Sequence, residues 1–242
     1  MLCVSAVAKD FTVKSPNGRL KATITVGDAI TYQVTYNGQQ LIAPSQISMT
    51  VENGETWGVG SKLKGATTAK RNATIKAQNY KRAVVKDCCN ELTLAFGGFS
   101  LVFRAYDEGL AYRFVSGSMK SLKIVAEQAD MNYPKDLETL VPYVREKGDV
   151  KKQLHNSFEN NYTLACLSEL RDGQLIFLPY IVKAEKGVKV VVAESDVENY
   201  PGMFVKKGNK ENSLDAVFAP CPKTVRQGGH NELEQFVAEA ED

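Results

Sequence analysis

The sequence predicts an all-β protein built as an antiparallel sandwich. About a dozen short segments alternate apolar and polar residues with a period of two, and almost none shows the longer period of a helix. Turn signals separate these segments, because Asn37-Gly38 is a hairpin dipeptide and Asp107-Glu108-Gly109 is typical of a tight turn. Many closely spaced strands without intervening helices favour a sandwich over an alternating βα fold.

The predicted strands follow one another along the chain, and most are rich in β-branched or aromatic residues. In the first half they cover residues 19–26, 30–36, 41–43, 47–51, 80–86, 91–96, 99–106 and 110–115. In the second half they cover residues 122–126, 139–144, 174–182, 188–194, 203–206 and 214–218.

Three segments lack this strand pattern. Residues 56–73 are rich in Gly and Lys and predict an irregular surface excursion, which includes Trp57, the single tryptophan. Residues 149–170 predict a long surface connection of the kind that often carries function. Its polar candidates are His155, Asn156, Glu159, Asn160, Asn161 and Tyr162. In the tail, Leu233, Phe236, Val237 and Ala240 fit one face of a helix.

Composition indicates a soluble globular protein. The 242 residues are 43% hydrophobic and 24% charged, and 30 basic against 28 acidic residues give a net charge of +2. Without a basic block, nucleic acid is not an expected partner. Without an apolar run of about 20 residues, neither is the membrane. We find no linker, so residues 11–242 are expected to form one domain.

The first ten residues are set apart from this domain. Residues 1–8 are apolar and end in Ala6-Val7-Ala8, which matches the cleavage site of a signal peptide whose basic start is missing. The alternative is a disordered N-terminus.

The five cysteines show no zinc spacing and no C-x-x-C motif. Adjacent Cys88 and Cys89 should point to opposite faces of a strand, which disfavours a disulfide between them. We expect most of the cysteines to be small buried hydrophobes.

One carboxylate stands out at the end of an apolar strand. The β-branched run at residues 188–192 favours a strand buried on both faces, and Val188, Val190, Val192 and Glu194 share one face. A turn at Asn199-Tyr200-Pro201-Gly202 follows. A Glu at the mouth of a buried strand needs a cation, a metal or hydrogen-bond donors, unless it simply lies in water.

No catalytic set is visible. A glycosidase needs two carboxylates placed across a sugar, and no spacing singles out such a pair. Nucleophile-elbow, Walker and zinc-protease motifs are absent from the sequence. The two histidines, His155 and His230, are more simply explained as solvated side chains.

Several stretches taken together resemble a known family. They are Ser15 to Leu20, Tyr32 to Gly38, Phe103 to Phe114, Glu194 to Met203, and Gly228-Gly229-His230-Asn231. In this order they are similar to the N-terminal domain of glycoside hydrolase family 97, from about residue 11 to residue 231. That family comprises α-glucosidases and α-galactosidases of the bacterial periplasm.

The resemblance implies a β-super-sandwich of the galactose mutarotase type, which precedes a catalytic (β/α)₈ barrel. It implies that this domain is not itself catalytic, packs on its own barrel, helps shape the pocket for an α-linked oligosaccharide, and supplies Glu194 to a calcium site. Ser195 and Val197 depart mildly from the family pattern. No barrel sequence follows Asp242, so we expect the chain alone to be inactive and to hold no calcium tightly. The alternative is a free-standing carbohydrate-binding or mutarotase-like module. Mutarotase-type chemistry needs acid–base partners, usually His plus Glu, and only His155 and His230 could serve as the histidine. The family's tail is extended, which disagrees with the helical pattern above.

Overall fold

The computed structural model describes residues 8–78, 81–118, 120–145, 147–154, 160–195, 197–198, 200–227 and 233–237. Fourteen strand pairs within this part of the chain are antiparallel. Helix there is limited to α1 (Val150–Gln153) and the 3₁₀ turns Leu167–Glu169 and Glu185–Gly187. The all-β prediction is therefore confirmed. No helix among the described residues is long and apolar enough to cross a membrane.

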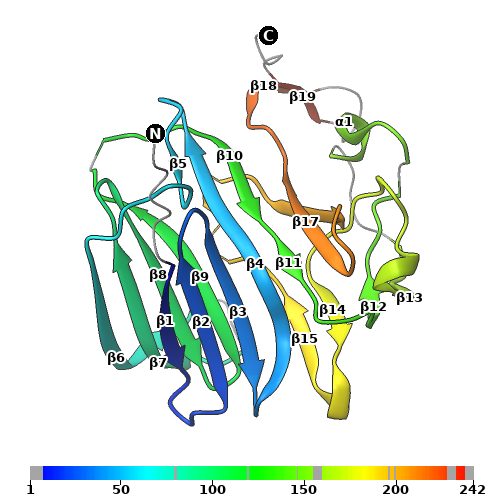
Figure 1. Ribbon diagram of the computed structural model, residues 1–242. Helices are drawn as coiled ribbons and strands as arrows, with labels where there is room; N and C mark the ends of the chain where they lie inside the picture. Colours follow the sequence, from blue (N-terminus) through cyan, green and yellow to red (C-terminus); the bar gives the residue numbers. More distant parts are fainter. Residues whose placement is uncertain are drawn as a thin grey trace, which may run out of the picture. The chain divides into compact units, whose positions relative to one another are not determined.

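The chain divides into two compact units, whose strands are drawn in Figure 1. Unit 1 comprises Met1–Asp136 with Lys210–Ser213, and unit 2 comprises Leu137–Asn209 with Leu214–Asp242. The single domain over residues 11–242 stays a prediction.

Unit 1 contains two sheets. In the first, the order is β1-β2-β3-β4-β11, and β5 and β10 also pair with β4. Its strands are β1 (Lys9–Lys14), β2 (Leu20–Val26), β3 (Ile30–Tyr36), β4 (Gln39–Val51), β5 (Thr56–Trp57), β10 (Ile124–Ala129) and β11 (Met131–Asn132). The second sheet has the order β6-β7-β8-β9. Its strands are β6 (Gly65–Lys76), β7 (Val84–Ala95), β8 (Phe99–Tyr106) and β9 (Gly109–Ser116).

Aromatic rings join the two sheets of unit 1. Period-two alternation turns every second residue of β2 and β8 inward, so that Ile24 and Phe103 are fully buried. Tyr32 of β3 packs on Phe103 at 6.3 Å between ring centroids. Trp57 is 4% exposed and stacks on Phe99 at 4.9 Å. The prediction that Trp57 lies in a surface excursion was therefore wrong, because its side chain fills the core of unit 1.

The prediction of an irregular surface excursion over residues 56–73 was also wrong for most of that segment. β6 is a regular strand of twelve residues that pairs with β7 along its whole length. It forms the edge of its sheet, and all its residues are exposed. A strand with no buried face needs no apolar alternation, so its Lys- and Thr-rich sequence gave no strand signal.

Unit 2 contains a sheet in the order β13-β12-β14-β15, a β16–β17 pair and a β18–β19 pair. Their bounds are β12 (Glu138–Val141), β13 (Thr163–Cys166), β14 (Tyr180–Lys183), β15 (Lys189–Val192), β16 (Met203–Lys207), β17 (Ser213–Phe218), β18 (Pro222–Gln227) and β19 (Leu233–Val237). Val144, Leu175 and Phe204 form a buried cluster, against which Leu154 and Phe177 pack.

Three further expectations about unit 2 need correction. Residues 174–179 are not in a strand, since β14 begins only at Tyr180. Residues 149–170 contain α1 and β13 rather than a plain connection. Residues 233–237 form β19 and not a helix, because backbone pairing with β18 overrides a short apolar pattern. Ala240 lies outside the described residues.

The cysteines are less buried than expected. Cys88 is exposed and Cys89 is buried, which confirms that they face opposite sides of β7. Cys221 is also exposed and Cys166 half-buried, so the expectation of mostly buried cysteines was wrong.

Candidate functional site

Glu194 follows an edge strand of unit 2. Among the described residues β15 pairs with β14 alone, and its residues alternate between exposed and half-buried. Val190 and Val192 share the half-buried face as expected, whereas Val191 on the other face is 57% exposed. The strand is therefore not buried on both faces, because nothing among the described residues covers its outer side.

The carboxylate of Glu194 is exposed and held by backbone. Its Oε2 accepts a hydrogen bond of 2.9 Å from the Met203 backbone N–H, at the start of β16. A Cβ built on Gly202 would lie 3.3 Å from Oε1, so the glycine leaves room for the carboxylate. Pro201-Gly202 returns the chain to β16 and so brings the amide to the acid.

The oxygens at this position suit a hard cation in type but not in number. Calcium takes about six to eight oxygen ligands, and a carboxylate supplies one or two of them. No group of three or more potential metal ligands exists among the described residues. Glu198 is a second exposed acid close along the chain. Asp196, which shares the face of Glu194 in sequence, lies outside the described residues.

The apolar side chains near Glu194 in sequence are only partly covered. Tyr200 and Met203 are half-buried, and Tyr200 packs edge-on against Phe218 at 6.1 Å. Val197, at 45%, is more exposed than either.

Three of the six candidates from the 149–170 segment cannot be placed. His155, Asn156 and Glu159 lie outside the described residues, as does His230. Asn160 donates to the Tyr143 carbonyl at 3.3 Å, and the Tyr162 hydroxyl donates to the Pro179 carbonyl at 2.9 Å. Both have structural partners.

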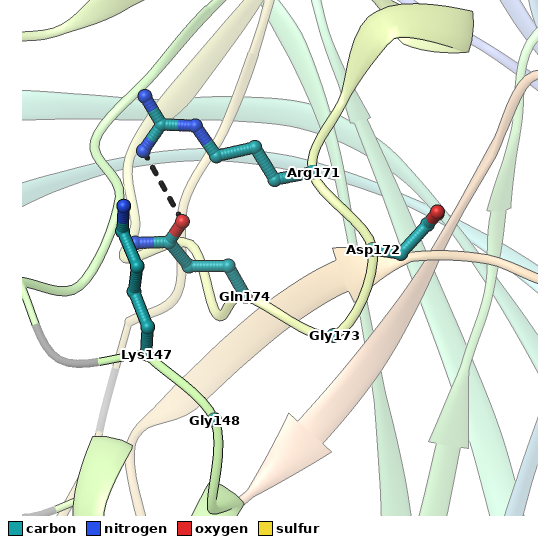
Figure 2. A pocket seen from close by; sticks show the side chains of 6 residues that line it. All are labelled: Lys147, Gly148, Arg171, Asp172, Gly173 and Gln174. Carbon is teal, nitrogen blue, oxygen red and sulfur yellow. Dashed lines mark hydrogen bonds between the residues drawn. The ribbon is translucent and has the colours of Figure 1, made fainter.

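A second polar site in unit 2 was missed from the sequence. Figure 2 shows a pocket of about 260 Å³ lined by Lys147, Gly148, Arg171, Asp172, Gly173 and Gln174. Fully buried Gln153 joins its two walls, since its Nε2 donates to the carbonyls of Gly148 and Gly173, both at 2.9 Å. Its Oε1 accepts from the Leu175 N–H at 2.7 Å. The sequence signal was weak because these residues come from two separate loops.

Comparison with known proteins identifies the chain. The family model described as Glycosyl-hydrolase 97 N-terminal matches residues 13–226, which is most of the chain. The chain belongs to this family. A retaining alpha-galactosidase of Bacteroides thetaiotaomicron is 45% identical over 237 residues. That match covers 97% of this chain and 36% of the relative.

Solved structures agree on the fold. A beta-arabinopyranosidase superimposes with a TM-score of 0.75 at 23% identity, over 87% of this chain and 36% of the other. A Glycoside Hydrolase Family 97 enzyme from Pseudoalteromonas sp. strain K8, solved with acarbose, has a TM-score of 0.72 at 20% identity. It is matched over 87% of this chain and 32% of the other. The family 97 chain thus spans about a third of the length of these relatives.

Proposed function

We propose that this chain is the non-catalytic N-terminal domain of a periplasmic, exo-acting α-glycoside hydrolase. In this role it packs on the catalytic barrel, helps shape the sugar pocket and supplies Glu194 as one calcium ligand. The name of the Bacteroides relative favours an α-galactoside as the substrate of the whole protein. The length of that relative beyond the match supports a separate catalytic part.

The observation that carries the proposal is the state of the Glu194 carboxylate. It is exposed, it is oriented by a single backbone N–H, and Oε1 has no donor among the described residues. A carboxylate that is not neutralised by a cation of its own chain stays negatively charged and can bind a cation that arrives later. Because one Glu cannot satisfy calcium, the other protein ligands would come from the catalytic part.

The test uses the full-length polypeptide. Glu194→Gln keeps the size of the side chain and removes its charge, so we expect weaker calcium binding in calorimetry and lower hydrolysis of nitrophenyl α-galactoside. The circular dichroism spectrum should not change, because the side chain is exposed. Glu198→Gln is the matched control and should leave both quantities unaltered.

Two results would overturn this assignment. Unchanged activity of Glu194→Gln after chelation and calcium titration would remove Glu194 from the mechanism. Tight stoichiometric calcium binding by residues 1–242 alone would mean that the site is complete within this chain.

A further inference from the structure

The pocket of unit 2 contains an arginine that is fixed in place before any ligand arrives. The Arg171 guanidinium lies over the Tyr143 ring at 4.5 Å, and its Nη1 donates to Gln174 Oε1 at 3.1 Å. The Arg171 backbone N–H also donates to the Tyr143 hydroxyl at 3.0 Å. Binding to such a side chain costs little further conformational entropy.

The groups that hold Arg171 are themselves rigid. Gln174 is 5% exposed, and its Nε2 donates to the Val144 carbonyl at 2.7 Å. Tyr143 is buried, and this burial raises the pKa of its phenol, although Arg171 and Lys207 oppose the shift. Tyr143 is therefore neutral and leaves the charge of Arg171 uncompensated.

The charge inside the pocket is positive. Lys147 and Arg171 extend to the same side, with Gln174 between them, in Figure 2. Among the described residues of the lining, Asp172 is the single acidic one, and it points away from Lys147 and Arg171. Its carboxylate is paired with Lys207 at 3.3 Å. Neither Lys147 nor Arg171 forms an ion pair with a described residue, so both can receive an anion.

The donor geometry of Arg171 and the size of the pocket limit the class of anion that can bind. With Nη1 bonded to Gln174, Arg171 keeps the N–H donors of Nε and Nη2, which point in parallel and match the two oxygens of a carboxylate. A volume of about 260 Å³ exceeds the space of a carboxylate alone, since a water takes about 30 Å³, and it is below that of drug-sized ligands. It leaves room for one ring attached to the acid.

We propose that this pocket binds a carboxylate-bearing sugar, a uronic-acid residue, with its carboxylate on Arg171 and Lys147; the choice of a sugar for the attached ring follows from the glycoside hydrolase family of the chain. This site shares no residue with the Glu194 site, so it does not depend on the proposed calcium role. Loss of uronate binding would leave the expected effects of Glu194→Gln unchanged.

The test is a titration of residues 1–242 with sodium galacturonate, followed by NMR through the Arg171 Nε–Hε signal. We expect saturable shifts with galacturonate, no shift with galactose, and at least about tenfold weaker binding of acetate, which lacks the ring. Arg171→Lys keeps the charge but loses the paired donors, so binding, followed there through backbone amides of the pocket, should weaken at least about tenfold. Lys147→Gln should weaken it by less, and exposed Lys151→Gln is the control that should not change it.

Each remaining outcome would overturn the proposal. Equal binding of acetate and galacturonate would leave the ring without a role. Equal binding of sulfate would make the pocket a general anion site. Unaltered galacturonate binding by Arg171→Lys, with thermal unfolding showing that the variant is folded, would place the ligand elsewhere. If none of the probes shifts the signal, the pocket does not bind ligands of this class.

Discussion

Gln153 offers the sharpest test of how unit 2 is held together, and we predict that Gln153→Met is strongly destabilising. The side chain is fully buried and makes three hydrogen bonds, to the carbonyls of Gly148 and Gly173 and from the Leu175 N–H. Methionine preserves the volume and removes all three. A buried donor left unpaired costs about 1–3 kcal/mol. Each lost bond to a carbonyl costs about 0.5–1.5 kcal/mol, because both glycines are exposed and water can replace the amide.

The expected loss in the free energy of unfolding is therefore about 4 kcal/mol, a large part of the usual 5–15 kcal/mol. Urea unfolding followed by circular dichroism measures it, and hydrogen exchange of the Leu175 amide reports the site directly. Gln40→Met is the control: this half-buried glutamine makes one side-chain bond, to Gln33, and should cost less than about 1 kcal/mol. A loss below about 1 kcal/mol for Gln153→Met, with unchanged exchange at Leu175, would refute the reasoning.

Two further predictions concern charge and activity. The hydrogen bond from Arg71, aided by one from Arg104, holds the pKa of Glu91 below its ordinary 4.5, although partial burial opposes this. A lowered folded-state pKa stabilises the protein above pH 4.5, and this stabilisation is lost as the pH falls through the folded value. Glu91→Gln should thus lower the free energy of unfolding by about 1 kcal/mol at pH 7. It should also reduce the loss of stability at acidic pH, as measured by thermal unfolding over a pH series. An unchanged dependence of stability on pH would contradict the pairing. Residues 1–242 alone should not hydrolyse nitrophenyl α-galactosides or α-glucosides, because no carboxylate pair is evident in the chain; metal-independent turnover that vanishes on mutating one of its acids would disprove this.

The fold class was predictable because most strands bury one face. Alternation in β2, β3 and β8 matches their burial almost residue by residue, and Asn37-Gly38 forms the expected hairpin with both residues at positive φ. In β15 the predicted alternation of faces is present, but the predicted burial on both faces is not. The sequence does not reveal whether a Val-rich strand lies at the centre or at the edge of a sheet.

The candidate sites differed in how far sequence could reach them. Glu194 could be singled out from the sequence because a charged residue follows a run of valines, a contrast visible along the chain. The Arg171 pocket was not found because Gln153, its central support, looks like any polar residue of a loop. Only the structure shows that this amide is buried and forms hydrogen bonds with residues 20 and 22 positions further along the chain.

Glu194 and Arg171 show the same physical arrangement with opposite charge. Each charged group is oriented by neutral partners: a backbone N–H for Glu194, and a phenol ring and an amide for Arg171. A salt bridge would orient these groups as well, but it would also neutralise them and compete with any ligand. Glu91 is the contrast within this chain, because two arginines already occupy its oxygens. Glu194 and Arg171 are therefore oriented without being neutralised, whereas the partners that orient Glu91 also neutralise it.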